Sequence, residues 1–240
     1  MGRLDAEMVS RRIVKSRNVA QQLIKEEKVF VNDRMISKPS FSVNDDDNIV
    51  IKGELPKYVG RGGLKLEKAL SEFNIDLSDK LCIDIGASTG GFTDCMLQNG
   101  ARLVYAVDVG KDQLDERLRT DKRVISLENT DVREAAEKIS DIADFISVDV
   151  SFISLKLVLP EVKTLLKQRG QAVALIKPQF EVGKSGLGKH GIVKSDMLRS
   201  KAVNEIKDFA EQIGFAVSEI IQSPITGGDG NIEYLIYLLL

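Results

Sequence analysis

The spacing of apolar and polar residues changes character near residue 60. Before that point, two short helical patterns are followed by brief apolar stretches. The clearer helical pattern follows Ser16, a residue suited to cap a helix. Its apolar positions are Val19, Ala20, Leu23 and Ile24. A weaker helix is expected around residues 4–9, and short strands at 29–31, 35–36 and 48–51. The pattern predicts a small α+β domain over residues 1–52 and a linker over 53–60.

Beyond residue 60, helices with one apolar face alternate with strands that are apolar throughout. Helices are predicted at 63–73, 91–99 and 197–213, and strands at 81–85, 103–107, 124–127, 145–149, 172–176, 216–222 and 233–239. Strands that are apolar on both faces and separated by helices are typical of a parallel sheet with both faces covered. No helical pattern separates the last two strands, so the last strand is expected to be antiparallel. Residues 61–240 are therefore predicted to form a mostly parallel α/β domain.

Composition narrows the class of protein. Hydrophobic residues make up 43% and charged residues 29% of the 240 residues, and the formal net charge is -2. No uncharged apolar run approaches the roughly 20 residues that span a bilayer, and the start lacks the apolar core of a secretion signal. Two cysteines, Cys82 and Cys95, do not make a disulfide framework, and a single histidine nearly excludes an ordinary zinc site. We expect a cytoplasmic protein without a bound metal.

A glycine-rich turn, residues 84–91, follows the strand at 81–85 and opens a helix. Glycines allow a ligand to approach the backbone closely, and ligands of parallel sheets bind beyond the carboxyl ends of the strands. Asp108 ends the next strand, 22 residues after Gly86, where a carboxylate can accept hydrogen bonds from both hydroxyls of a ribose. No Lys-Ser or Lys-Thr pair follows the glycines, which excludes a P-loop, and the spacing departs from the dinucleotide pattern Gly-x-Gly-x-x-Gly.

An acid two residues before the first glycine suits S-adenosylmethionine, because Asp84 would receive the ammonium group of that cofactor. The expected cofactor-binding residues are Asp84, Gly86, Ala87, Ser88, Gly90, Gly91, Phe92, Asp108 and Asp131. Two alternatives stay open. The turn can be a tight strand–helix connection that binds nothing, and Asp131 can cap a helix in place of facing the adenine amino group.

Three motifs carry a resemblance to a known family. Residues 84–93 (DIGASTGGFT), 149–154 (DVSFIS) and 177–181 (KPQFE) resemble the TlyA family, often labelled hemolysin A, whose characterised members are rRNA 2′-O-methyltransferases. The resemblance implies a Rossmann-like S-adenosylmethionine-dependent methyltransferase sheet similar to the FtsJ type. Residues 3–51 resemble the small S-four RNA-binding domain, so the resemblance covers nearly the whole chain.

The FtsJ type uses a lysine, aspartate, lysine, glutamate tetrad. By motif and order, the resemblance implies that the catalytic residues here are Lys65, Asp149, Lys177 and Glu233. A ribose 2′-hydroxyl needs in-line alignment and a place for its proton. Lys177 is expected to contact the 2′-oxygen, either as a neutral amine that accepts the proton or as an ammonium that stabilises the forming alkoxide. Asp149 is expected to orient Lys177, and the other two residues to position the ribose.

Charge is distributed unevenly along the chain. Residues 1–38 hold nine basic and five acidic residues, although the whole chain is acidic. The expected RNA contacts are Arg3, Arg11, Arg12, Lys15, Arg17 and Lys25, which would meet phosphates. The alternative is a solvated basic face. A second segment, 180–193, is rich in glycine and is either a lid over the cofactor and RNA or a surface loop.

The sequence thus predicts S-adenosylmethionine-dependent ribose 2′-O-methylation of ribosomal RNA, with rRNA or ribosomal subunits as the partner. One alternative is an RNA-binding or ribosome-assembly protein with an inactive methyltransferase fold. The other is the membrane-lytic protein that the hemolysin label suggests, for which the sequence offers no span, strongly amphipathic basic helix or signal.

Overall fold

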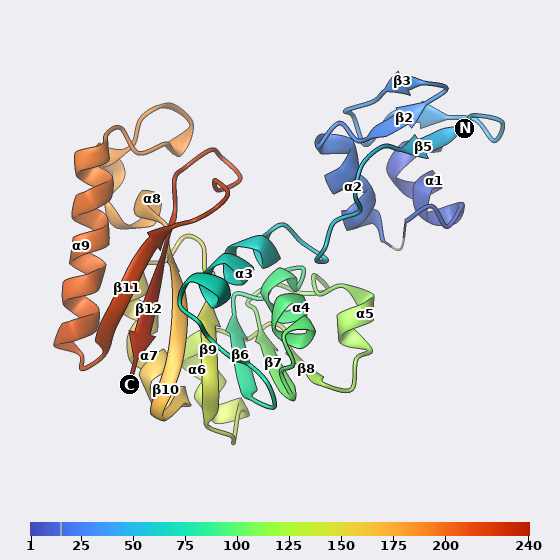
Figure 1. Ribbon diagram of the computed structural model, residues 1–240. Helices are drawn as coiled ribbons and strands as arrows, with labels where there is room; N and C mark the ends of the chain where they lie inside the picture. Colours follow the sequence, from blue (N-terminus) through green and yellow to red (C-terminus); the bar gives the residue numbers. More distant parts are fainter. Residues whose placement is uncertain (15) are drawn as a thin grey trace. The chain divides into compact units, whose positions relative to one another are not determined.

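The computed structural model describes residues 1–14 and 16–240, and the chain divides into two compact units, Met1–Arg61 and Gly62–Leu240 (Figure 1). Lys15, one of the expected RNA contacts, lies outside the described residues. Each unit has its own hydrophobic core. The predicted linker over residues 53–60 stays a prediction.

The first unit is a small α+β fold. Its elements are β1 (Gly2–Arg3), α1 (Leu4–Ser10), α2 (Arg17–Lys25), β2 (Val29–Val31), β3 (Arg34–Met35), β4 (Ser42–Val43) and β5 (Ile49–Ile51). Strand β2 pairs antiparallel with β3 and with β5, and β1 pairs with β4. Ser16 caps α2 by accepting a hydrogen bond from the Val19 amide, and the predicted apolar face of this helix is buried.

The second unit holds a seven-stranded sheet in the order β11-β12-β10-β9-β6-β7-β8. The strands are β6 (Leu81–Ile85), β7 (Leu103–Val107), β8 (Val124–Leu127), β9 (Ala143–Val148), β10 (Leu166–Ile176), β11 (Ala216–Gln222) and β12 (Tyr234–Leu239). Strands β8, β7, β6, β9 and β10 are parallel, whereas β12 runs antiparallel to both β10 and β11. The predicted mostly parallel sheet with an antiparallel last strand is confirmed.

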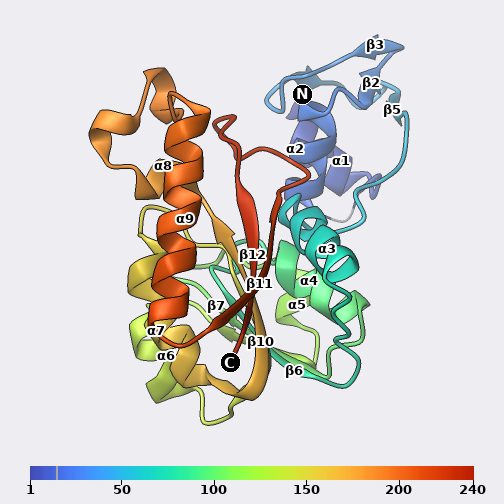
Figure 2. The ribbon, with the colours of Figure 1, turned by 60° about the vertical axis from the view of Figure 1, so that its left-hand side comes forward.

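Helices cover both faces of this sheet (Figure 2). One side carries α3 (Gly62–Glu72), α4 (Gly91–Gln98) and α5 (Glu116–Arg119), and the other carries α6 (Val132–Lys138), α7 (Leu155–Leu165) and α9 (Asp196–Gln212). After β10 come the short helix α8 (Pro178–Glu181) and the 3-10 turns η1 (Lys184–Gly186) and η2 (Lys189–Gly191).

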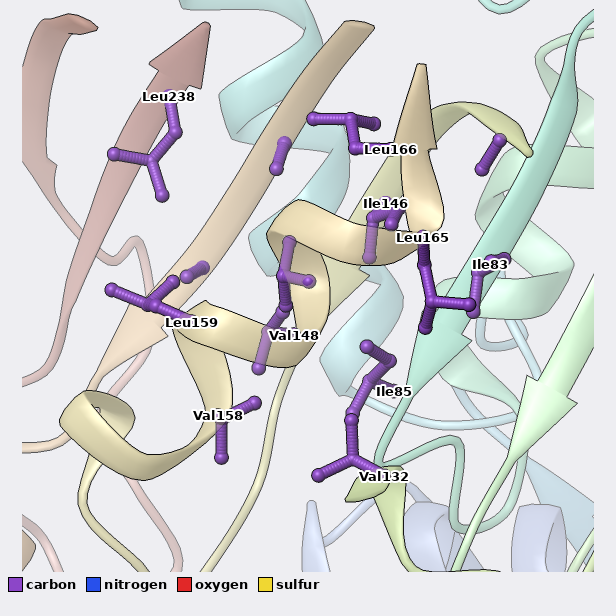
Figure 3. Packing of buried hydrophobic residues seen from close by; sticks show 14 of the residues in the cluster. Ile83, Ile85, Val132, Ile146, Val148, Val158, Leu159, Leu165, Leu166 and Leu238 are labelled. Carbon is purple, nitrogen blue, oxygen red and sulfur yellow. The ribbon is translucent and has the colours of Figure 1, made fainter. Parts of the chain in front are cut away.

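The core between the sheet and α7 fixes the strands that carry the site. Val158 and Leu159 of α7 pack with Ile146 and Val148 of β9, and all four side chains are fully buried (Figure 3). Each such residue contributes roughly 1.5–3 kcal/mol relative to its exposed state. The helix itself was not among the predicted elements, because Pro160 lies inside its apolar pattern and a proline normally argues against a helix interior.

Strand β10 also differs from its prediction. It begins at Leu166, although the sequence pattern predicts only 172–176. Leu166 pairs with Ala143, and the register shifts before pairing resumes at Gln171. The polar residues between these two pairs resemble a turn in sequence, which is why the pattern missed the first half of the strand.

Candidate active site

A cavity of about 380 Å³ opens at the carboxyl ends of β6, β7 and β9. Its walls come from the turn after β6, the end of β7, the approach to α6 and the segment after β9. Strand β6 lies between β7 and β9: the chain runs from β6 outward to β7 and β8, and then crosses back to β9 on the other side of β6. Such a switch point is where open parallel sheets bind ligands, and the volume falls within the roughly 300–1,000 Å³ usual for small-molecule sites.

Asp108 presents a carboxylate in this cavity. Its Oδ2 accepts a hydrogen bond from the Ser88 amide at 2.7 Å, and its Oδ1 accepts one from the Gly110 amide at 2.6 Å. Two backbone amides thus fix the carboxylate. Each carboxylate oxygen has more than one acceptor site, so both can still accept from a ligand. This geometry suits two neighbouring hydroxyls, as a ribose provides.

Gly86 brings the backbone of two loops together at the cavity wall. Its φ is +85°, in the region that favours glycine, and a Cβ there would lie 2.4 Å from the Asp149 carbonyl oxygen. No other residue type fits without moving the segment that follows β9. The first glycine of the turn therefore sets the distance between this turn and Asp149.

The four residues of the expected tetrad lie together beside the cavity. Lys65 in α3 forms an ion pair with Glu233, which directly precedes β12, with Nζ 2.7 Å from Oε2. The Lys65 Nζ also lies 3.9 Å from Asp149 Oδ2, and Lys177 Nζ lies 2.7 Å from Asp149 Oδ1. Asp149 itself lines the cavity. Two cations and two anions thus alternate in one row, in which each charge faces an opposite one.

Comparisons with known proteins agree with this geometry. The FtsJ-like methyltransferase family matches residues 58–239, and the S4 domain matches residues 2–49. A Mycobacterium tuberculosis protein named 16S/23S rRNA (cytidine-2'-O)-methyltransferase TlyA is 39% identical over 98% of this chain and 89% of its own length. The chain belongs to the TlyA family of FtsJ-like methyltransferases. It is an enzyme whose cofactor is S-adenosylmethionine.

Two further relatives of this TlyA-family protein match nearly the whole of its chain. Hemolysin A of Brachyspira hyodysenteriae is 42% identical and covers 99% of this chain and 100% of the relative. A solved structure described as a hemolysin from Streptococcus thermophilus shares 45% identity, with a TM-score of 0.79 over 99% of this chain and 87% of the other. The predicted family and the two-domain resemblance are confirmed.

Asp84 has a different place from the one expected. Its side chain is fully buried, and its oxygens accept hydrogen bonds from Thr93 Oγ1 at 2.7 Å and Ser147 Oγ at 2.8 Å. Burial raises the pKa of this carboxyl to about 6, against the lowering effect of the two hydroxyl donors. The geometry does not support direct receipt of the cofactor ammonium, because no surface of Asp84 reaches the cavity. We assign Asp84 to holding β6, β9 and the start of α4 together beneath the turn.

Asp131 caps a helix, as one of the two alternatives predicts, and a contact with the adenine amino group stays a prediction. It lines the cavity, and it also caps α6 by accepting a hydrogen bond from the Arg133 amide. The Arg133 side chain pairs with the carboxylate through Nε and Nη2, and these bonds lower the Asp131 pKa to about 2. Asp131 is therefore a negatively charged residue at the cavity wall near neutral pH.

The remaining cofactor residues expected from the sequence separate into two groups. Gly86 and Ser88 line the cavity, whereas Ala87, Gly90, Gly91 and Phe92 do not and are buried in the turn and α4. At Gly90 the φ is +95° and a Cβ would overlap Leu118, so this glycine serves packing. Sequence reasoning missed much of the wall, including Val109, Gln113, Thr130 and 150–153. The sequence feature that could have identified them is their position, since most of them follow the carboxyl end of a predicted parallel strand.

Two side chains next to the tetrad were also missed. Ser151 Oγ accepts a hydrogen bond from Lys177 Nζ at 2.9 Å and lines the cavity. Gln179 Nε2 donates to Glu233 Oε1 at 3.4 Å. Both residues belong to the motifs that carry the family resemblance, 149–154 and 177–181. Ser151 therefore joins Lys177 directly to the cavity wall.

Phe152 is a highly exposed aromatic side chain of this wall. It is 91% exposed, has a φ of +64°, and packs against Phe180 with ring centroids 5.1 Å apart. A positive φ is unfavourable for an aromatic residue, and such strain is usually found at functional sites. An exposed ring at the cavity edge, beside the ring nearest Lys177, gives the site an apolar flat surface toward solvent.

The glycine-rich segment 180–193 is folded. The Lys194 amide donates to Gly186, and the Gly188 amide donates to Ile192. The buried Asn231 side chain accepts from the Val193 amide at 3.0 Å and donates to Gly191 at 3.1 Å. These bonds attach the segment to the loop that leads to Glu233. A lid role for this segment stays a prediction.

The expected RNA contacts of the first unit lie in different environments. Arg3 and Arg17 both pair with the buried Asp5 and remain about half exposed. Arg11 instead pairs with Glu7 and donates to the carbonyls of Asn44 and Asp47, so it holds the turn before β5. Arg12 and Lys25 are exposed and form no ion pair with any residue that the structure describes.

Residues 1–14 and 16–240 contain neither a metal-binding cluster nor a membrane-spanning helix. No group of three or more histidine, cysteine, aspartate and glutamate side chains lies close enough together there to hold a metal ion. No helix in that part of the chain combines the length and the apolar character needed to cross a bilayer.

Proposed function

We propose that this protein transfers a methyl group from S-adenosylmethionine to a ribose 2′-hydroxyl of ribosomal RNA, and that it does so in the cytoplasm on rRNA or a ribosomal subunit. The observation that carries the proposal is the Lys177–Asp149 ion pair at the cavity edge, with Nζ 2.7 Å from Oδ1. A named relative acts on rRNA cytidine 2′-oxygens, which supports the same substrate class here.

The residues present fit the cofactor. The fixed Asp108 carboxylate accepts from the ribose hydroxyls, and Gly86 allows the turn to pack against the backbone of the segment that follows β9. Apolar side chains such as Val109 and Val132 line the same cavity and suit the adenine ring. When bound, S-adenosylmethionine supplies a methyl group that is already activated by its sulfonium.

The chain's own residues then act on the RNA oxygen. An ammonium carries three N–H donors. Lys177 Nζ uses one on Ser151 Oγ and is held by the Asp149 carboxylate, so a further N–H remains for the 2′-oxygen. An ammonium at that point stabilises the negative charge that builds on the 2′-oxygen, while the hydroxyl proton passes to solvent water. Glu233 and Asp149 balance the two lysines, so the site brings a positive charge to the oxygen without a net charge of its own.

Burial strengthens this arrangement. The Lys65 and Glu233 side chains are 9% and 2% exposed, and the Lys177 side chain is 11% exposed. Ion pairs shielded from water are screened less by salt than surface pairs, so their geometry is held more firmly. The prearranged charges need little rearrangement when the reaction begins, which is the main source of electrostatic catalysis.

The two alternatives have less support. An inactive methyltransferase fold has no need for four charged residues brought together beside the cavity from α3, the positions that follow β9 and β10, and the position that precedes β12. The membrane-lytic alternative rests on the names of relatives alone. The S4 match at residues 2–49 supports RNA as the partner.

The test is methyl transfer in a defined mixture. Purified protein, deproteinised rRNA from cells that lack the gene, and S-adenosylmethionine with a labelled methyl group should yield labelled 2′-O-methyl nucleosides. Nuclease digestion followed by mass spectrometry separates ribose from base methylation. Label on a base, or no label although the cofactor binds, would reject the proposal.

A further inference from the structure

Asp5 holds two exposed arginines from separate elements. It lies in the first turn of α1, and its side chain is fully buried. Its Oδ1 accepts from Arg3 Nε at 3.0 Å, and its Oδ2 accepts from Arg3 Nη2 at 3.0 Å, Arg17 Nη2 at 3.0 Å and Gln21 Nε2 at 2.8 Å. One carboxylate therefore joins a guanidinium from β1 to one from the start of α2.

The bonds leave both arginines available. Arg3 and Arg17 side chains are 53% and 55% exposed. A guanidinium has five N–H donors in a fixed planar arrangement, and Arg17 donates to Asp5 through Nη2 alone. Each arginine thus keeps donors that face water. Arg11 differs, because its guanidinium is taken up by Glu7 and two backbone carbonyls.

Holding an arginine in place lowers the cost of binding. A free arginine side chain loses about 1.5–2 kcal/mol of rotamer freedom when it is fixed, and prior fixing removes part of that cost from the binding step. The Arg3 bonds keep the Asp5 pKa well below its usual range despite burial, so the carboxylate stays ionised across the physiological range. Asp5 therefore holds the two arginines at every pH of the physiological range.

We propose that Asp5 is a positioning residue that sets Arg3 and Arg17 as a pair for neighbouring phosphates of an RNA backbone. The choice of RNA as the polyanion rests on the proposed function. The opposite interpretation is that Asp5 only neutralises the arginines and weakens RNA binding. The two interpretations predict changes of opposite sign when the carboxylate is removed.

The first experiment compares Asp5→Asn with Glu7→Gln in the full chain. Both substitutions remove one negative charge from α1 next to an arginine, but Glu7 touches Arg11 and not the pair. Filter binding to deproteinised rRNA is measured at several salt concentrations without cofactor. We expect Asp5→Asn to bind at least fivefold more weakly despite its added positive charge, whereas Glu7→Gln binds as well as the wild type or better.

The salt dependence of binding shows whether Asp5→Asn has lost a phosphate contact or has lost rRNA affinity for another reason. Each phosphate contact contributes about -0.7 to the salt slope on single strands and about -0.9 on duplex. We expect the slope of Asp5→Asn to become shallower by about one such contact. Binding by Asp5→Asn as tight as that of Glu7→Gln, with an unchanged or steeper slope, would show that Asp5 only neutralises.

A second variant covers the case in which Asp5→Asn fails to fold. Arg3→Lys keeps the charge but removes the two-pronged bond to Asp5. It should bind rRNA several-fold more weakly, whereas Arg34→Lys, on the exposed strand β3, should not change binding. Equal binding by both lysine variants would overturn the inference.

Methyl transfer by the wild type is measured alongside. If the wild type methylates rRNA and both tests of the pair fail, only the inference about Asp5 is rejected. If the wild type transfers no methyl group but the variants weaken rRNA binding as expected, the proposed reaction is rejected and the arginine pair stands.

Discussion

Asp149 and Lys177 form the contact on which the proposed chemistry depends, with Oδ1 and Nζ 2.7 Å apart at the ends of adjacent parallel strands. The second oxygen of the same carboxylate faces Lys65 at 3.9 Å. A single aspartate thus connects the two lysines of the tetrad. The backbone carbonyl of Asp149 also packs closely against Gly86, where it leaves no room for a Cβ. Asp149 therefore belongs to the tetrad and also contacts the glycine-rich turn.

Replacing Lys177 with alanine should abolish methyl transfer and leave cofactor affinity nearly unchanged. In the proposed reaction Lys177 acts on the 2′-oxygen, and loss of a group that stabilises transition-state charge costs about 10²-fold or more. Transfer of labelled methyl to rRNA and calorimetric titration with S-adenosylmethionine measure the two effects. Lys156→Ala is the control, because that lysine of α7 forms a half-exposed ion pair with Glu205 of α9. A Lys177→Ala enzyme with wild-type turnover would show that the tetrad assignment is wrong.

Ser151→Ala should lower kcat about tenfold without weakening cofactor binding. The hydroxyl fixes one N–H of Lys177, so its loss lets Nζ move away from the 2′-oxygen. Ser151→Thr keeps the hydroxyl and should restore most of the rate. If serine, threonine and alanine at this position gave the same kcat, the contact with Lys177 would have no role in turnover.

Asp108→Ala should weaken S-adenosylmethionine binding by tenfold or more. Hydrogen bonds to charged groups contribute about 1.5–3 kcal/mol each, and two ribose bonds are lost. Asp112→Ala serves as the control, since that residue lies on the same connection but its carboxylate faces Arg119 at 3.8 Å. Calorimetry on both variants measures the affinities, and an unchanged affinity for Asp108→Ala would place the adenosine elsewhere.

Asp84→Asn should change how stability depends on pH. The carboxyl ionises at about pH 6 when folded, against an ordinary value of 3.8, so the folded state binds the proton more tightly than the unfolded state. Wild-type stability from this group is present below pH 4 and is lost as the pH rises through 6, by about 3 kcal/mol. The asparagine variant lacks this loss.

Denaturant unfolding at pH 4 and pH 7 checks the sign. The free energy of unfolding of Asp84→Asn, relative to the wild type, should be higher at pH 7 than at pH 4. An equal difference at both pH values would mean that Asp84 ionises with its ordinary pKa in the folded protein.

The fold was largely predictable because its signals are local. Strands buried on both faces are apolar throughout, as in 81–85, and this signal located most of the sheet. Two-residue strands such as β1 and β4 leave no pattern, and Pro160 concealed α7. The start of β10 resembles a polar turn because its pairing is irregular there.

The location of the site could be predicted from the sequence, but most of the side-chain contacts within it could not. Asp108 and Gly86 could be chosen because the ends of parallel strands meet at one edge. The tetrad was predicted from the family resemblance. Lys65 and Glu233 are 168 residues apart, and no sequence pattern indicates that their side chains are in contact. The depth of Asp84 and the hydrogen bond of Ser151 depend on packing between strands, which no local pattern encodes.

The most direct test of the account is a map of 2′-O-methylation on rRNA treated with purified wild-type protein and with Lys177→Ala. The account predicts one or a few riboses that are methylated only by the wild type, with no new methylated base. Wild-type protein that binds S-adenosylmethionine but leaves every ribose unmodified, or that methylates a base, would contradict it.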